Sequence, residues 1–438
     1  MARTDTLEHF LTDVADALRS KTGAQALIDA DTFDAEISGI PSGVDWSIIG
    51  YQNAPESVQD VISKGLPVLQ NFTPTLFNNW YYNTNRTGDT GCSVNDYLQV
   101  MPKLPLEDYW PMNGAMLFAR NPSLIEVPDM AWENISTNGH FDSSFGAAYG
   151  MFQDCSSLQY LPNLNLINAD GPCSYIFSYC TCLKEVHMTL PKMTLLNYGF
   201  QGCKRIKTIE LLNCEKLLQT MSMCSGCELL ENFTITNAPL LWKMDSMFSN
   251  CRALTVTPNL PDNENATYSS TFYGCYGLVE STLVLSNAVN VYSMFSACTH
   301  LTTLPANLDL SKATNMNYLF NQCSALVSIP EFDCSSCVIF NDVVSGCYAL
   351  ENIGGFKDLG KAYLTKAVAN FTNYRIYLGN DLTNLTKQSI LNIFNDVYDI
   401  ATKGCKVQQI YVPSRIYSQL TAAEIQIATD KGWTVLSA

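Results

Sequence analysis

Apolar and polar positions follow one pattern that recurs about every 24 residues along the middle of the chain. The repeating unit reads Phe-x-x-Cys-x-x-Leu, and the positions next to Phe and Leu are mostly polar. Some copies replace one apolar residue, with Cys224 or Val344 for Phe and Ile206 for Leu. The spacing of 23 to 25 residues defines a cysteine column, whose members are Cys155, Cys180, Cys203, Cys227, Cys251, Cys275, Cys298, Cys323 and Cys347.

Each copy predicts one coil of a solenoid, because a unit of this length cannot bury its apolar face without a neighbour. An earlier copy with Asn121 in the cysteine column brings the count to ten. Alternating stretches such as residues 283–286 and 308–311 predict short strands, and a helical turn such as residues 291–295 ends the coil. The predicted fold class is an α/β repeat, a leucine-rich-repeat solenoid of about ten coils of about 24 residues.

Residues 1–43 carry a helical pattern instead. Apolar residues at helical spacing in residues 4–20 predict an amphipathic helix, and a segment of this length is too small to fold alone. We expect this helical attachment segment to dock on a partner protein or on copies of itself in a homo-oligomer, such as a trimer. Packing back onto the solenoid is the alternative. The predicted attachment stripe consists of Leu7, Phe10, Leu11, Val14 and Leu18.

The rest of the chain divides into three parts. We predict an N-terminal cap over residues 44–96, the solenoid over residues 97–373 and an α/β C-terminal cap over residues 374–438. A cap is expected because a solenoid must cover the apolar face of its last coil. The elements predicted in the C-terminal cap are strands at residues 375–379 and 408–412, a helix at residues 387–402 and a second helix from a capping box of Thr421 and Glu424 to Lys431.

Composition and charge narrow the possible partners. Hydrophobic residues make up 47% of the 438, enough for a large core, and the net charge of −16 argues against nucleic acid. No stretch of about 18 apolar residues occurs, so no membrane span is predicted. The first residues lack the apolar core of a secretory signal, so we expect the 17 cysteines to be reduced and buried.

The repeat resembles that of the BspA-type leucine-rich-repeat proteins, as in MFQDCSSLQYLP, MFSNCRALTVTP and MFSACTHLTTLP. This resemblance covers about residues 97–380. The segments MARTDTLEHFLTDVADALRSKTG and DWSIIGYQNAPESVQD look like the N-terminal parts of tail-associated proteins in phages and prophages of gut Gram-positive bacteria. The ending LTAAEIQIATDKGWTVLSA is similar to the closing segment of repeat proteins found in the same phages. The second resemblance implies a virion protein, made in the host cytoplasm, that joins other tail or baseplate proteins through its N-terminal helix.

No pattern in the chain predicts catalysis, a cofactor or a metal site. Cys334 and Cys337 form a CxxC pair with no second pair at zinc spacing, which favours a structural role over zinc or redox chemistry. Glutamates two positions after the column Leu never occur in neighbouring coils, so no glycosidase pair is predicted there. The histidines lie outside the usual zinc motifs, and they are His9, His140, His187 and His300.

Two groups of aromatic residues are candidates for receptor binding. From Phe118 to Phe152 the chain has 34 residues where a coil takes about 24, so an insertion within residues 132–149 must leave the solenoid as a loop. Tyrosine suits recognition because it gives contact area and a hydrogen bond at little entropic cost. The candidates are Trp132, His140, Phe141, Phe145 and Tyr149 in the insertion and Tyr273, Tyr276, Tyr292 and Tyr348 in later coils.

The sequence thus predicts a non-enzymatic tail fibre or receptor-binding protein that recognises a host cell-surface glycan or protein through its solenoid. A purely structural tail or baseplate component is the main alternative. A polysaccharide depolymerase and a bacterial surface adhesin are less favoured. For the insertion, the alternative is that Phe141 and Phe145 cover the first coils as part of the cap.

Overall fold

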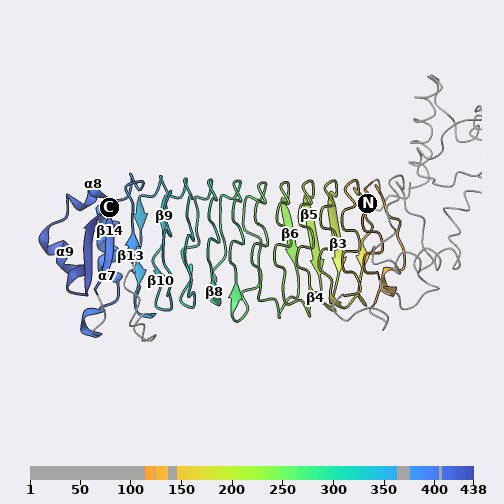
Figure 1. The fold of residues 1–438 in the computed structure, drawn as a ribbon, viewed down its shortest axis with the longest axis horizontal. Helices are drawn as coiled ribbons and strands as arrows, with labels where there is room; N and C mark the ends of the chain where they lie inside the picture. Colours follow the sequence, from red (N-terminus) through yellow and green to blue (C-terminus); the bar gives the residue numbers. More distant parts are fainter. Residues whose placement is uncertain (1–113, 123, 137–145, 363–374, 404–406) are drawn as a thin grey trace, which may run out of the picture.

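The computed structural model describes residues 114–122, 124–136, 146–362, 375–403 and 407–438. Within these ranges the chain winds into a β-solenoid of about 11 coils, which stand side by side along one long axis (Figure 1). The predicted leucine-rich-repeat solenoid is therefore confirmed, and it has about one coil more than we counted. Outside the described residues lie the predicted N-terminal cap and the attachment stripe of Leu7, Phe10, Leu11, Val14 and Leu18.

A first ladder of parallel pairing joins the coils just after the leucine column. In most coils the residue two positions after the column Leu pairs with its counterpart in the next coil, as Val256 does with Glu280 and Glu280 with Thr303. Where several residues pair, short strands result. The strands of this first ladder are β1 (Leu164–Asn165), β3 (Glu185–Thr189), β5 (Thr208–Leu212), β6 (Asn232–Ile235), β9 (Ser328–Ile329) and β11 (Asn352–Ile353).

A second parallel ladder runs along another side of the coils. Single bridges continue it from coil to coil, for example Gln219 to Lys243 and Lys243 to Thr267. Between the two ladders of the last coils, a further pair of strands forms, β10 (Phe332–Asp333) with β12 (Phe356–Lys357). The strands of the second ladder are β2 (Gly171–Pro172), β4 (Met193–Leu195), β7 (Ala266–Thr267) and β8 (Ala288–Asn290).

The strands predicted at residues 283–286 and 308–311 are not formed, so this part of the prediction was wrong. Both stretches lie between the ladders, where the coils differ in length. Ten residues separate Glu280 from Asn290, whereas twelve separate Thr303 from Asn315. Because neighbouring backbones cannot stay in register across such a difference, these two stretches form no strand pair, although the Asp309 N–H still donates to the Val284 carbonyl at 2.8 Å.

The Phe-x-x-Cys segments form a third side, which we call the turn edge: in each coil, the residues from three before the column Phe to one after the column Cys. Within residues 291–295, alternate N–H groups bond to the next coil, such as Ser293 to the Asn317 carbonyl at 2.8 Å. Ser293 has a left-handed φ of 50°. The helical turn predicted here is therefore a run of turns, because half of its N–H groups serve the neighbouring coil.

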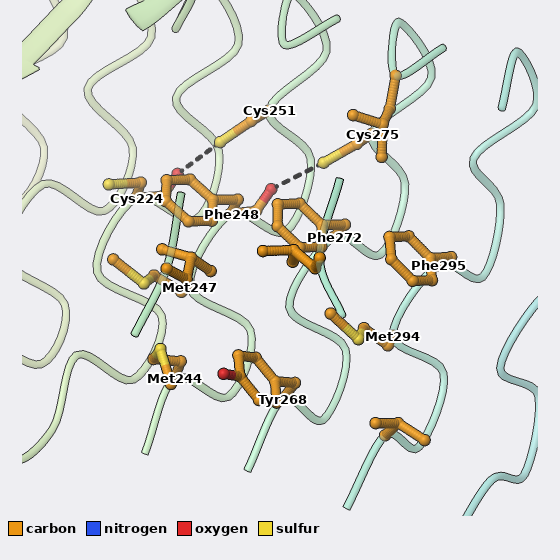
Figure 2. Packing of buried hydrophobic residues seen from close by; sticks show 14 of the residues in the cluster. Cys224, Met244, Met247, Phe248, Cys251, Tyr268, Phe272, Cys275, Met294 and Phe295 are labelled. Atoms are coloured by element: carbon orange, nitrogen blue, oxygen red, sulfur yellow. Dashed lines mark hydrogen bonds between the residues drawn. The ribbon is translucent and has the colours of Figure 1, made fainter. Parts of the chain in front are cut away.

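Phenylalanines of the column stack along the core. Phe272 lies between Phe248 and Phe295, with ring centroids 5.5 and 5.6 Å away and nearly parallel planes (Figure 2). All three rings are buried, and Met247 and Met294 precede two of them in the sequence and are buried with them. The apolar face of each coil is therefore covered by the next coil, as expected for a repeat array.

The column cysteines do more than fill space. The thiol of Cys275 donates a hydrogen bond to the carbonyl oxygen of Phe248 in the preceding coil, at 3.0 Å (Figure 2). Cys251 likewise donates to the carbonyl of Cys224, at 3.2 Å. The same bond recurs in every coil from Cys155 to Cys347, so a row of weak S–H···O bonds ties the turns together.

The C-terminal residues fold into a small α/β unit at the end of the rod opposite residue 114 (Figure 1). The strand predicted at residues 408–412 and the capping box of Thr421 and Glu424 are confirmed. The helix predicted over residues 387–402 ends earlier, because the Tyr398 N–H turns away to donate to the Leu359 carbonyl at 3.0 Å. The elements are β13 (Arg375–Tyr377), α7 (Lys387–Asp396), the 3-10 helix η4 (Ala401–Lys403), β14 (Gln408–Val412), α8 (Ser414–Tyr417), α9 (Ala422–Thr429) and β15 (Trp433–Ser437).

Helix α7 docks directly on the last coils. The hydroxyl of Ser389 accepts a hydrogen bond from the N–H of Ile353 at 2.9 Å and donates to the carbonyl of Glu351 at 3.1 Å. The Asn392 side chain donates to the Ile353 carbonyl at 2.9 Å. Polar side chains of one helix thus satisfy backbone groups of β11 and of the residue before it, which have no further coil to pair with.

Candidate recognition surface

Three tyrosines gather on the turn edge of the coils next to the insertion. The ring of Tyr175 stacks on Tyr198 with centroids 4.9 Å apart and meets Tyr149 edge-on at 5.7 Å. Tyr175 and Tyr198 hold left-handed φ values of 62° and 58°, which are uncommon for large side chains. Hydrogen bonds from their N–H groups to the next coil, at 3.0 and 2.8 Å, hold this conformation. The surface is therefore built in advance of any ligand.

This tyrosine group was predicted only in part. Tyr149 was a candidate, whereas Tyr175 and Tyr198 were missed, although both stand two residues before a column Phe. Desolvation by burial raises the pKa of Tyr149 and of Tyr175 above the ordinary value. A tyrosine of ordinary pKa is already protonated at neutral pH, and the shift moves ionisation further away, so both phenol groups can donate hydrogen bonds.

The tyrosines predicted in the later coils also lie on the turn edge and are exposed, from 36% at Tyr292 to 57% at Tyr348. Tyr273 follows the column Phe, and Tyr276 and Tyr348 follow the column Cys. The Arg252 guanidinium lies 5.6 Å from the Tyr276 ring. Aromatic residues therefore mark the turn edge over much of its length, with charged groups beside them.

One candidate was wrong. Trp132 is 1% exposed and belongs to the 3-10 helix η3 (Trp132–Asn134), which packs its indole against Phe118 and Phe152 at 6.3 and 6.2 Å. The insertion therefore begins inside the core and uses its first aromatic residue to seal the first coils. His140, Phe141 and Phe145 lie outside the described residues, so their role in recognition stays a prediction.

Burial makes the cysteines of the column unreactive. All 15 in the described part of the chain are free, and the nine of the column are fully buried. Desolvation by burial is the largest cause that raises the pKa of the Cys275 thiol to about 12, from 9.0. Cys155 and Cys347 are raised to about 12 in the same way. A protonated thiol is neither a nucleophile nor a metal ligand, so the column is structural.

Thiol labelling tests this conclusion. In the folded protein at neutral pH, the partly exposed Cys182 should be labelled by a thiol reagent well before Cys275, and peptide mapping by mass spectrometry separates the two. In denaturant, the labelling of both thiols should be fast. Two or more native disulfides within the column would refute its structural role as buried, reduced thiols.

The raised pKa of the buried thiols also predicts a pH dependence of stability. Above pH 9 the thiols of the unfolded chain ionise, whereas the buried thiols of the folded protein stay protonated. The free energy of unfolding should therefore fall as the pH rises towards 12.

Among the described residues, the CxxC pair and the two histidines His187 and His300 show no metal-binding arrangement. Cys334 and Cys337 flank a turn after β10, are fully buried, and burial raises the pKa of Cys337 to about 12. His187 contacts Glu210 at 2.8 Å on the first ladder, and His300 lies 2.6 Å from the Tyr276 carbonyl. No cluster of three or more potential metal ligands occurs among the residues described by the structure. His9 and His140 lie outside them.

A match between the chain and the sequence model of a protein family shows its family. The sequence model of the BspA type leucine-rich repeat region matches six copies, over residues 148–279 and 244–366. Together the matches extend over residues 148–366, which is half of the chain. The chain belongs to the BspA-type leucine-rich-repeat family. Leucine-rich-repeat proteins act in general as binding proteins, through the extended surface of their stacked coils.

Several solved structures are similar to this chain at low sequence identity. A leucine-rich-repeat protein of T. pallidum (TpLRR) is 19% identical, with a TM-score of 0.30 over 44% of this chain and 80% of that one. A leucine-rich-repeat protein from Bacteroides ovatus is 16% identical, with a TM-score of 0.21 over 78% and 88%. A chain of the TLR13–ssRNA13 complex is 13% identical, with a TM-score of 0.21 over 79% and 53%. No curated protein sequence matches significantly.

Among the helices in the described ranges, none is both long and apolar enough to cross a bilayer. The longest is α7, with ten residues. A bilayer-spanning helix needs about 20.

Proposed function

We propose that this BspA-type protein is a non-enzymatic recognition protein that binds a cell-surface glycan or protein through the tyrosines of its turn edge. The observation that carries the proposal is the placement of these rings. Tyr273, Tyr276 and Tyr292 are exposed, yet each carbonyl has a partner in a neighbouring coil. The carbonyls of Tyr273 and Tyr292 accept from the N–H groups of Asn250 and Ser270, both at 2.7 Å, and that of Tyr276 lies 2.6 Å from the His300 ring nitrogen Nδ1. A rigid scaffold that presents tyrosines loses little entropy on binding.

We further propose that the protein works in a phage tail and recognises the surface of a Gram-positive gut bacterium. The support is the resemblance of its N-terminal segments to tail-associated proteins and of its C-terminal end to repeat proteins of the same phages. In this proposal the N-terminal helix joins other tail or baseplate proteins and brings copies of the chain together. Several copies would place several turn edges on one cell, and avidity would then compensate for a weak single contact.

Binding to whole cells tests the recognition proposal. We expect the fluorescently labelled protein to bind intact Gram-positive gut bacteria, and the triple variant Tyr273→Ser, Tyr276→Ser and Tyr292→Ser to bind at least roughly tenfold more weakly, because aromatic anchors carry much of an interface's energy. Flow cytometry measures both. The matched control is Val256→Ser with Val279→Ser, which changes two residues of similar exposure (42% each) on the first ladder.

Two outcomes would refute recognition by the turn edge. One is an equal loss of cell binding in the control and in the tyrosine variant, and the other is unchanged cell binding of the tyrosine variant. Circular dichroism of both variants excludes unfolding as the cause, since all of the changed residues are exposed. Periodate treatment of the cells should abolish binding if the receptor is a glycan, and protease treatment if it is a protein.

A further inference from the structure

A hollow lies on a part of the solenoid that the tyrosines do not occupy. It sits at the corner just before the second ladder, between two neighbouring coils, and has a volume of about 460 Å³. This volume falls within the range of about 300–1,000 Å³ that is usual for small-molecule sites. Its lining comes from two short segments, namely Pro239, Leu240 and Trp242 of one coil and Asn263, Glu264 and Asn265 of the next.

The two walls are fixed to each other. The Asn263 side chain donates hydrogen bonds to the carbonyls of Ala238 and Leu241, at 3.0 and 2.7 Å, and so ties one segment to the other. The backbone of Trp242 is held on both sides, since its N–H donates to Leu218 at 3.1 Å and its carbonyl accepts from Thr267 at 2.8 Å. The hollow is therefore preformed, which lowers the entropic cost of binding.

The lining combines one aromatic platform with polar groups. Trp242 is half-buried, and Leu240 beside it is 47% exposed although it is apolar. Glu264 is exposed and makes no ion pair or hydrogen bond with any residue that the structure describes. A pyranose ring has a face of C–H groups that packs on an indole and hydroxyls that donate to a carboxylate or an amide oxygen. We propose that this hollow binds a neutral hexopyranose unit of a saccharide.

The charges near the hollow favour a neutral ligand. The Glu264 carboxylate repels an anionic sugar, and the net charge of the chain is −16. The Lys243 ammonium lies 5.7 Å from the Trp242 ring, so a cationic ligand would meet a like charge at the platform. A hydroxyl-rich ligand without charge meets neither penalty. The site does not depend on the proposed role of the turn edge.

Four simple glycosides test the proposal: the methyl glycosides of α-glucose, α-mannose, β-galactose and β-N-acetylglucosamine. We expect saturation-transfer NMR to detect at least one with the full chain, with a dissociation constant on the order of 1 mM. Trp242→Ala should weaken this binding at least roughly tenfold, as removal of an aromatic anchor does. Trp242→Phe should keep part of it, and Glu264→Gln should weaken it several-fold. Ile339→Ala, an exposed apolar residue of the second ladder, should change nothing.

Three results would overturn the inference. They are the absence of saturation transfer from all four glycosides, unchanged binding by Trp242→Ala, and a clear preference for choline over every sugar. Because Trp242→Phe keeps an aromatic ring, a folding defect of the alanine variant leaves the test intact. The triple tyrosine variant should bind the glycoside normally, so failure of the proposed function and failure of this site are distinguishable.

Discussion

Replacing Phe272 by Ala should cost about 3–5 kcal/mol of stability, the usual range for removing a buried phenylalanine. The ring is fully buried and stacks on Phe248 and Phe295, so its loss opens contacts with both neighbouring coils (Figure 2). In a solenoid each coil contacts only its neighbours, so the defect weakens the coupling between the two halves. Urea unfolding followed by circular dichroism should show a lower midpoint and a transition that splits in two.

Tyr273→Ala is the matched control, because it removes the adjacent aromatic residue, which is 44% exposed. We expect a change of about 0.5 kcal/mol or less. A loss as large as that of Phe272→Ala would show that the turn edge contributes to stability as much as the core. A single sharp transition in Phe272→Ala with an unchanged midpoint would contradict the stacked core.

Truncation after residue 358 should convert the protein into a self-associating or aggregating form. The deletion removes α7, so the apolar side chains of Ile353 and Phe356 and the backbone of β11 lose the helix that packs against them. An open ladder end with apolar residues is a template for pairing with another chain. Light scattering after size-exclusion chromatography measures the effect, and an unchanged mass and melting temperature would show that the last coil needs no cover.

A single substitution tests the contact between α7 and β11 without removing the helix. Ser389→Ala leaves the buried N–H of Ile353 without its acceptor, at a cost of about 1–3 kcal/mol. The neighbouring exposed residue provides the comparison, since Gln388→Ala should change the unfolding midpoint little. Equal effects of the two substitutions would mean that the hydrogen bond between α7 and β11 adds nothing.

The sequence by itself determined the solenoid, because every coil must bury the same columns. Phe, Cys and Leu recur at 23 to 25 residues, and residues at equal positions in successive coils must stack. The capping box at Thr421 and the strand of residues 408–412 were likewise predictable, since each depends on residues close in sequence. The exposure of Tyr273 and Tyr348 followed from their places beside the column residues.

Only the tertiary structure decided features that join one coil to the next. Strands do not form at residues 283–286 and 308–311 because the coil lengths differ there, as for Glu280 to Asn290 and Thr303 to Asn315, and a pattern within one coil does not show this. The thiol bond from Cys275 to Phe248 crosses 27 residues and depends on the direction of a carbonyl. Trp132 looked like a loop residue among polar neighbours, yet it fills the space beside Phe118 at the end of the core.

The hollow at Trp242 is another feature that only the tertiary structure decided. Its two walls are about 24 residues apart in the sequence, and their polar and apolar residues form no motif in either segment alone. The Asn263 side chain brings them together by bonding to two carbonyls of the other coil. Periodicity reveals which residues share a column, because the backbone repeats. It does not reveal which side chains meet at a corner, because that depends on how each coil closes.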